Sequence, residues 1–150
     1  MDTFGPLYAA ADLAQFLAET YSEAAVSREL GAPDRLLRVA EENGELVGFC
    51  KLGLTTTLPV PLGDRRALEL KQLYVRRTHH GTAVSQDLMA WALEEAGRRR
   101  YDDVVLSVYC DNARAQRFYR RYGFEHVGDH FFMVGAHRDD EWLLRLRLTP

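Results

Sequence analysis

The sequence predicts an α/β fold with a central sheet of mixed strand direction, and three observations support this. Asn43-Gly44 separates two apolar runs and is a strong signal for a β-hairpin. The strand-like run Ala67–Val75 leads through a turn of small residues into the helix-like run Ala83–Ala96. A second helix-like run, Asn112–Tyr122, precedes two further strand-like runs. Helices that alternate with strands in this way pack on the faces of a sheet.

The N-terminal part is expected to contain two helices before the hairpin. The first, Asp12–Thr20, begins with capping-box spacing, and the second, Ser22–Leu30, stops before a glycine and a proline. The hairpin strands are expected at Leu36–Glu42 and Glu45–Leu54. The next segment, Thr55–Arg66, holds two prolines and a glycine, so we expect a loop there.

The remaining elements follow from periodicity and from end signals. One face of Ala83–Ala96 is apolar, and Gly97 is expected to end this helix. The apolar run Val104–Val108 is typical of a short buried strand. Asn112 can cap the second helix, and Gly123 is expected to close it. The last strands are expected at Phe124–Val134 and Glu141–Leu148, joined by a polar turn at His137–Asp140.

Composition excludes several classes of function. The chain has 150 residues, about the size of one domain, and is 47% apolar and 27% charged. A net charge of −3 argues against general nucleic-acid binding, which requires a basic surface. No apolar run is long enough to cross a membrane and no signal peptide opens the chain. We therefore expect a cytoplasmic protein without a membrane partner.

Basic runs and cysteines carry simple interpretations. The runs Arg98–Arg100 and Arg117, Arg120 and Arg121 are typical of a solvated helix face, and a groove for an anionic ligand is the alternative. The two cysteines, Cys50 and Cys110, lie far apart in apolar contexts and lack metal-site or redox spacing. We expect buried thiols in a reducing compartment and no metal.

The stretch Tyr74–Gly97 raises the possibility of a phosphate site. It runs from a strand, through a glycine preceded by two histidines, into a helix. Backbone N–H groups and the helix dipole favour an anion at such a helix N-terminus. The turn lacks the lysine of a P-loop and the three glycines of a dinucleotide fingerprint. A phosphate cradle and a plain strand-to-helix turn both stay open.

A second pattern, N-x-x-A-x-x-F-Y-x-x-x-G-F, begins at Asn112. Its spacing places Asn112, Ala115 and Tyr119 on one face of a helix. This face combines a capping amide, a small residue that allows close approach, and a phenol. Core packing explains the neighbouring aromatic residues, but it does not require an alanine and a tyrosine on this stripe.

These stretches resemble the GNAT acetyltransferase superfamily, over roughly Leu36 to the C-terminus. The strand ending in Leu-Tyr-Val, with Gly81 in the turn after it, is similar to the family's central motif, although His80 and Ser85 depart from its usual residues. The pattern that begins at Asn112 is similar to the family's late motif. The following V-G-x-H and D-x-W-L elements resemble, more narrowly, the bacterial polyamine-acetylating, PaiA-like branch.

The resemblance implies a single GNAT domain over residues 1–150, with a mixed, mostly antiparallel central sheet flanked by helices. It also implies direct transfer of an acetyl group from acetyl-CoA to an amine in a ternary complex. N–H groups of the turn would hold the CoA pyrophosphate, and the pantetheine arm would run along the end of the strand. The implied acetyl-CoA-binding residues are Leu73, Tyr74, Val75, His80, Gly81, Thr82, Ala83, Val84, Ser85, Asn112, Ala115 and Tyr119.

The resemblance also implies two catalytic residues. Tyr119 would protonate the leaving thiolate, with a core tyrosine as the alternative. An amine with a pKa near 10 must first lose its proton, and Glu69 would accept it. Water as the base, and an ordinary outward strand charge at position 69, are the alternatives. Acidic candidates for the acceptor side are Glu41, Glu42, Glu125, Asp129, Asp139, Asp140 and Glu141.

The N-terminus departs from the family pattern. We expect the family's first strand to be missing and its first helix to be short. The strand Leu36–Glu42 is then expected to be a sheet edge or to be covered by a partner chain, and a homodimer is one expected assembly.

Three functions stay open on the sequence. The first is N-acetylation of a primary amine on a small molecule, a polyamine being one candidate. The second is acetylation of a protein N-terminus or lysine. The third is a non-catalytic acyl-CoA-binding module, which the short N-terminus and the residues at His80 and Ser85 suggest.

Overall fold

The computed structural model describes residues 34–80 and 83–150, so the helices expected at Asp12–Thr20 and Ser22–Leu30 lie outside the described residues. In chain order the described elements are β1 (Arg35–Glu42), β2 (Glu45–Gly53), β3 (Ala67–Val75), the 3-10 turn η1 (Arg77–His79), α3 (Ala83–Arg98), β4 (Asp103–Tyr109), α4 (Ala113–Arg121), β5 (Glu125–Val134) and β6 (His137–Arg147).

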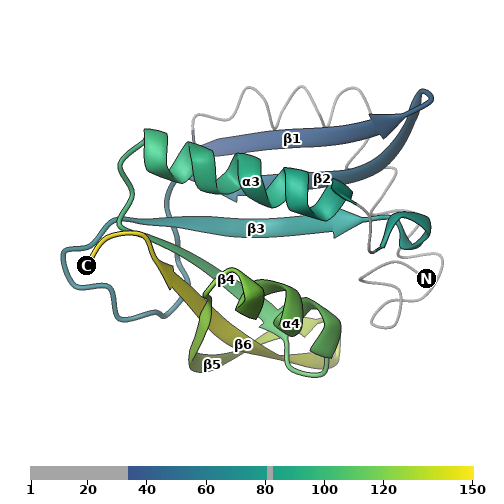
Figure 1. The fold of residues 1–150 in the computed structure, drawn as a ribbon. Helices are drawn as coiled ribbons and strands as arrows, with labels where there is room; N and C mark the ends of the chain where they lie inside the picture. The colour runs from purple at the N-terminus through teal and green to yellow at the C-terminus, as the bar shows by residue number, and fades with distance from the viewer. Residues whose placement is uncertain (1–33, 81–82) are drawn as a thin grey trace. The chain divides into compact units, whose positions relative to one another are not determined.

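The strands follow the order β1-β2-β3-β4-β6-β5 (Figure 1). The ladders β1–β2, β4–β6 and β5–β6 are antiparallel, and β3–β4 is parallel. The expected mixed, mostly antiparallel sheet with helices is therefore confirmed. The chain divides into two compact units: unit 1 contains Met1–Gly53 and Gln72–Ala92, and unit 2 contains Leu54–Lys71 and Leu93–Pro150.

Unit 1 is built on the β1–β2 hairpin. Asn43 and Gly44 have φ angles of 54° and 79°, the two positive angles that a type I′ turn requires. Strand β2 buries Val47–Cys50, and α3 buries Leu88 and Met89. Strand β1 contributes no fully buried side chain. The core of unit 1 therefore lies on β2, the end of β3 and the first half of α3.

The end of α3 differs from the expectation. Gly97 lies inside the helix, which continues to Arg98. Arg100 takes the left-handed φ of 61°, donates its N–H to Gly97 O at 3.1 Å, and is followed by a bond from Tyr101 N to Ala96 O at 2.9 Å. These two bonds form a Schellman motif with a non-glycine residue at its left-handed position. Tyr101 and Ala96, which the second bond joins, are both buried.

Unit 2 has its core on both faces of the β4–β6 ladder. Val104 and Leu106 face one side with Leu144, and Val105 faces the other, all nearly inaccessible to solvent. On the Val105 side, a cluster with Leu143 is covered by the loop after β2. The loop residues in or against this cluster are Leu58, Val60 and Leu62. The expected loop Thr55–Arg66 therefore packs on one face of the sheet.

The β5–β6 hairpin corrects the expected polar turn at His137–Asp140. These residues begin β6, and Val134 pairs directly with His137 across a two-residue turn. Gly135 has a φ of 62°, which suits such a tight turn. Polar residues extend the strand because its alternate side chains face solvent, whereas Asp139 is buried.

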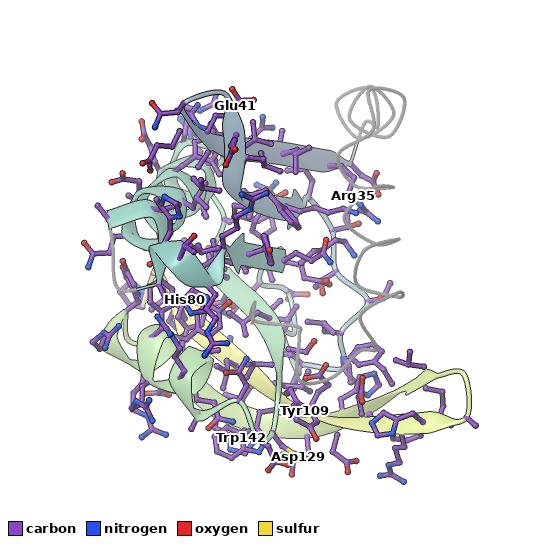
Figure 2. The ribbon with its side chains drawn as sticks, turned by 90° about the vertical axis from the view of Figure 1, so that its right-hand side faces the viewer. Arg35, Glu41, His80, Tyr109, Asp129 and Trp142 are labelled. Atoms are coloured by element: carbon purple, nitrogen blue, oxygen red, sulfur yellow. The ribbon has the colours of Figure 1, made fainter. Side chains whose placement is uncertain are left out.

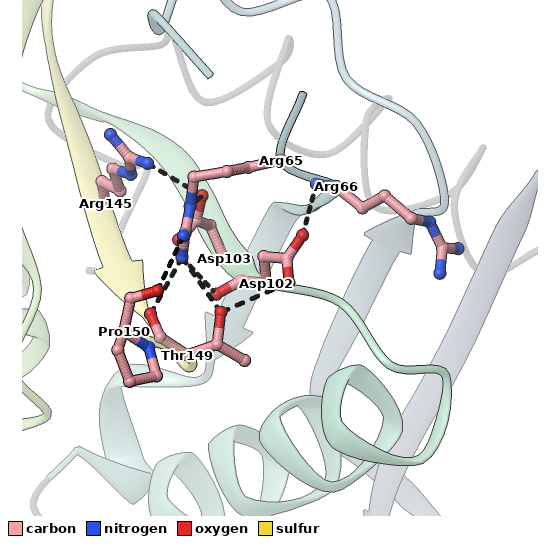
Figure 3. Close-up of polar contacts among 7 residues, drawn as sticks. All are labelled: Arg65, Arg66, Asp102, Asp103, Arg145, Thr149 and Pro150. Atoms are coloured by element: carbon pink, nitrogen blue, oxygen red, sulfur yellow. Dashed lines mark hydrogen bonds and ion pairs between the residues drawn. The ribbon is translucent and has the colours of Figure 1, made fainter. Parts of the chain in front are cut away.

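A buried carboxylate anchors one end of the β4–β6 ladder (Figure 3). Asp103 is fully buried, and its two oxygens accept bonds from Arg65 at 2.8 and 2.9 Å and from Arg145 at 3.0 Å. Burial alone would raise the pKa of Asp103, but the hydrogen bonds and charges of the two arginines outweigh it and lower the pKa. Arg65 also donates to Thr149 O and Pro150 O, which ties down the C-terminal residues.

Candidate functional site

The expected site residues fall in both units. Unit 1 holds the end of β3, the turn after it and the start of α3. Gly81 and Thr82 of this turn lie outside the described residues. Unit 2 holds Glu69, β4, α4 and the β5–β6 hairpin.

The end of β3 is a largely buried strand. Tyr74 is 2% exposed and its ring centroid lies 5.5 Å from that of Phe49, while Val75 is buried and Leu73 half-buried. A Cβ at Gly48 would approach Tyr74 O to 2.7 Å and also contact α3, so only glycine allows this approach of β2. The sequence reasoning missed Gly48, although a glycine inside an apolar strand is itself a signal for close backbone approach.

The turn after β3 is held by two histidines with separate partners. His80, labelled in Figure 2, places Nε2 3.0 Å from the carbonyl oxygen of Val75. Because a carbonyl can only accept, Nε2 carries the hydrogen and donates it. His79 Nε2 lies 2.7 Å from Glu42 Oε2, and the backbone N–H of Arg76 donates to Val47 O. The side chain of His80 therefore closes the turn onto the strand end.

The start of α3 has the chemistry of an anion site. Ala83 is exposed, and Val84 and Ser85 are half-buried. The first turn of the helix contains no acidic residue, and Arg76 and Arg77 precede it with exposed side chains. Positive charge and the dipole of a helix N-terminus both attract an anionic group such as phosphate.

Helix α4 confirms the expected cap. Asn112 Oδ1 accepts a bond from the backbone N–H of Ala115 at 3.1 Å. Gln116 was not singled out from the sequence, yet its amide donates to the carbonyls of Tyr109 and Cys110 at 3.1 and 2.7 Å. It fixes the connection between β4 and α4. The helix begins at Ala113 and ends at Arg121, so the face with Ala115 and Tyr119 is helical as expected.

Tyr119 is held between two aromatic rings. It is 7% exposed, and its ring lies edge-on to Phe118 at 5.4 Å and to Phe124 at 5.6 Å. These contacts hold the ring from two sides in the edge-to-face geometry that aromatic pairs prefer. The arginines at positions 117, 120 and 121 are exposed, as a solvated helix face predicts.

Glu69 is buried. It is 8% exposed, Thr56 Oγ1 donates to its Oε1 at 2.5 Å, and Lys71 Nζ lies 3.3 Å from its Oε2. Glu69 is also the last residue of the β3–β4 ladder, which pairs Ala67–Glu69 with Asp103–Val105. Both carboxylate oxygens are therefore occupied, one of them by a hydroxyl from the loop after β2.

The acidic candidates for the acceptor side separate into three environments. Glu42 pairs with His79, Asp129 with His126 and Asp140 with Arg138, and all three carboxylates are largely exposed. Asp139 is 4% exposed, and its Oδ1 lies 2.8 Å from His137 Nε2 without hydrogen-bond geometry. Burial first, and the charge of Asp139 second, raise the pKa of Glu141 to about 7.

The two cysteines are free thiols in different surroundings. Cys50 is fully buried, and burial raises its pKa to about 12, whereas Cys110 is only half-buried. Within the described residues, no group of three or more His, Cys, Asp or Glu side chains is placed to hold a metal ion. No helix in the described part of the chain is long and apolar enough to cross a membrane.

Comparison with known proteins decides the family. The model of the Acetyltransferase (GNAT) family matches residues 5–124. The chain belongs to the GNAT acetyltransferase family. An uncharacterized N-acetyltransferase of Mycobacterium tuberculosis is 32% identical over 139 residues, which cover 93% of this chain and 84% of the relative. Another, from Lactobacillus delbrueckii subsp. lactis, is 29% identical over 149 residues, which cover 99% and 85%.

The fold comparison agrees with this family. The crystal structure of PaiA N-acetyltransferase from Thermoplasma acidophilum in complex with coenzyme A superposes with a TM-score of 0.68. It covers 97% of this chain and 83% of that one at 19% identity, which supports the GNAT fold. The protein is therefore an acetyl-CoA-dependent N-acetyltransferase of the GNAT family, and the resemblance found in the sequence is confirmed.

Proposed function

We propose that this GNAT enzyme acetylates a primary amine of a small molecule, and that the amine attacks acetyl-CoA directly in a ternary complex. The observation that carries the proposal is the α4 face, on which the capped helix carries Ala115 and a Tyr119 ring packed edge-on against Phe118 and Phe124. A polyamine is the first substrate class to test, because the sequence resembles the PaiA-like branch. In this proposal residues 1–150 form one domain. This is supported by β3 and α3, each of which contributes residues to both units.

Acetyl-CoA would be bound mainly through backbone groups. N–H groups from His80 to Ser85 would hold the pyrophosphate, and the bond from His80 to Val75 O supports a fixed turn for this purpose. The pantetheine arm would follow Leu73–Val75, which lie beyond the last pair of the β3–β4 ladder. Asn112 and Ala115 would complete the contacts, the alanine by leaving room.

Tyr119 would act as the general acid. When the amine attacks the thioester carbon, the C–S bond breaks and leaves its electron pair on sulfur. A phenol with a pKa near 10 can donate its proton to the departing thiolate. The fixed orientation of the Tyr119 ring supports this role, because a positioned acid donates without first being ordered.

Glu69 is the carboxylate that the sequence proposes as base. The burial of Glu69 supports a functional carboxylate over an ordinary strand charge that points outward. To accept a proton on Oε1, however, it must release the short bond from Thr56, and its Oε2 is already in an ion pair with Lys71. Glu69→Gln tests the assignment, because a base at this position predicts loss of the ascending limb of the pH–rate profile.

The first experiment is an acetylation panel with acetyl-CoA as donor. The acceptors are putrescine, spermidine, propylamine and an alanine-initiated peptide, and the readout is release of free CoA thiol. Turnover of a small amine supports the proposal, and turnover of the peptide alone would favour protein acetylation instead. Acetyl-CoA should also raise the melting temperature, and Gly81→Val should remove most of that shift by placing a side chain in the turn.

The second experiment tests the acid. Tyr119→Phe should preserve the fold and acetyl-CoA binding but slow the chemical step by about 10²–10⁴-fold. The loss should appear in kcat and kcat/KM together, since the interaction forms mainly in the transition state. Tyr122→Phe removes a hydroxyl from the same helix end and is the matched control. Near-normal turnover by Tyr119→Phe, with chemistry rate-limiting, would contradict the acid role.

A further inference from the structure

Glu141 of β6 has a carboxylate oxygen without a protein partner. Its Oε2 atom is buried and accepts no hydrogen bond from the described residues. A buried carboxylate oxygen in this state is unusual, because such atoms normally have a hydrogen-bond partner in native structures. The arrangement is stabilised if a donor from outside the chain reaches this oxygen.

The ladder register defines what faces Glu141. Tyr109 of β4 and His130 of β5 lie directly opposite, and directly opposite residues point to the same side of a sheet. Tyr109, labelled in Figure 2, is the last residue of β4. Two positions before Glu141 on β6, Asp139 shares this face, and four positions after it Arg145 is bound to Asp103.

No cation neutralises this group within residues 34–80 and 83–150. None of their lysine, arginine or histidine side chains forms an ion pair with Glu141, and Asp139, whose charge adds to the effect of burial on its pKa, has the same sign. The aromatic side chains of His130 and Phe132, which meet edge-on at 4.7 Å, flank it from β5. The surroundings therefore favour a cation with an apolar body, which describes an alkylammonium ion.

We propose that Glu141 receives the ammonium group of the acceptor and takes its proton. The inference rests on the proposed acetylation of an amine. One proton of the ammonium ion passes to the carboxylate, and the amine nitrogen keeps the electron pair. That pair forms the new C–N bond as the C–S bond breaks. Of the two protons that the nitrogen loses, one ends on the CoA sulfur and the other is returned by Glu141 to water.

The contrast with Glu69 supports this assignment. Both oxygens of Glu69 are already engaged, by Thr56 and by Lys71. Glu141 instead has an oxygen without a hydrogen-bond partner, and its pKa of about 7 matches the range in which a general base works best at neutral pH. The sequence had placed Glu141 among the acidic residues for acceptor binding, without a chemical role.

The test is the pH dependence of kcat/KM for the fastest of the panel amines, putrescine, spermidine, propylamine and the alanine-initiated peptide. Wild type should show an ascending limb near pH 7. Glu141→Gln should lose this limb and react at least about 10²-fold more slowly at pH 7. The deficit should shrink toward pH 10, where the free amine no longer needs a base. Glu141→Asp keeps a carboxylate and should keep the limb at a lower rate.

Two controls make the outcomes distinct. Glu94→Gln removes an exposed carboxylate of α3 that has no place in the proposed site, and it should leave the profile unchanged. Acetyl-CoA should shift the melting temperature of Glu141→Gln as much as that of wild type, which shows an intact fold. A Glu141→Gln enzyme that keeps the limb, or whose deficit is the same at every pH, would overturn the inference while leaving the acetyltransferase function intact. No turnover of any panel amine by wild type would overturn both.

Discussion

The β4–β6 ladder carries a carboxylate near each end: Asp103 is fully buried and Glu141 is half-buried, and their pKa values shift in opposite directions. Asp103 begins β4 and is neutralised by two arginines, so its pKa is lowered. Glu141 pairs with the last residue of β4, and burial together with the charge of Asp139 raises its pKa, since no positive partner in the described part of the chain offsets them. The difference shows that burial alone does not decide the role of a carboxylate; its counter-charges do.

The largest expected effect is on the stability contributed by Asp103. Asp103→Asn leaves two partly buried arginines without their counter-charge, and we expect the free energy of unfolding to fall by roughly 2–4 kcal/mol. Chemical denaturation of both proteins at pH 7 measures it. Glu141→Gln under the same conditions should be neutral or stabilising. If both substitutions destabilised the protein equally, the two ends of the ladder would not differ as described.

The second-largest expected effect is on the pH dependence of stability, which should differ between Glu141 and Asp103. The pKa of Glu141, about 7, lies above its ordinary value of 4.5. Its contribution to stability is therefore fully present below pH 4.5 and is lost as the pH rises through 7. For this partly exposed group we expect a loss of about 1–2 kcal/mol between pH 5 and pH 8. Melting temperatures across this range should fall for wild type and stay level for Glu141→Gln.

For Asp103 we expect the opposite dependence of the melting temperature on pH. Its pKa lies below its ordinary value of 3.8, so its contribution is present above pH 3.8 and is lost as the pH falls through the lowered pKa. Melting temperatures at acidic pH should therefore drop more steeply for wild type than for Asp103→Asn. An equal acid slope in the two proteins would contradict the neutralisation by Arg65 and Arg145.

A positive charge placed opposite Glu141 should make this carboxylate more like the neutralised Asp103. His130→Lys puts a permanent cation on the residue that pairs with Glu141, which should lower the pKa of Glu141 and move the ascending limb to lower pH. Cross-strand charge pairs contribute about 0.2–1 kcal/mol, so the effect on stability should be modest. Phe131→Lys, opposite Asp140 on the other face, is the matched control and should leave the limb in place.

The smallest effect is expected at the exposed pair of Asp140 and Arg138. Their atoms lie 2.9 Å apart, but both side chains are about 60% exposed (61% and 58%). Asp140→Asn should change the free energy of unfolding by less than about 0.5 kcal/mol. A change as large as that of Asp103→Asn would mean that exposure does not separate these carboxylates.

Local chemistry made much of the fold and part of the site predictable. Asn43-Gly44 forces a tight turn wherever it occurs between strands, and the Asn112 cap needs only residues three positions apart. The face with Ala115 and Tyr119 follows from helix periodicity. The polar start of β6 was mistaken for a turn because a strand with one solvated side shows the same composition as a loop.

The sequence by itself determined the order of strands and helices along the chain, most caps and turns, and the family motifs. These features depend on residues that are only a few positions apart. Only the tertiary structure decided which carboxylates are neutralised. Arg65 and Arg145 reach Asp103 from 38 and 42 residues away, whereas no cation of the described residues reaches Glu141. Charge compensation depends on distances in space, which strand pairing sets and the sequence pattern does not show.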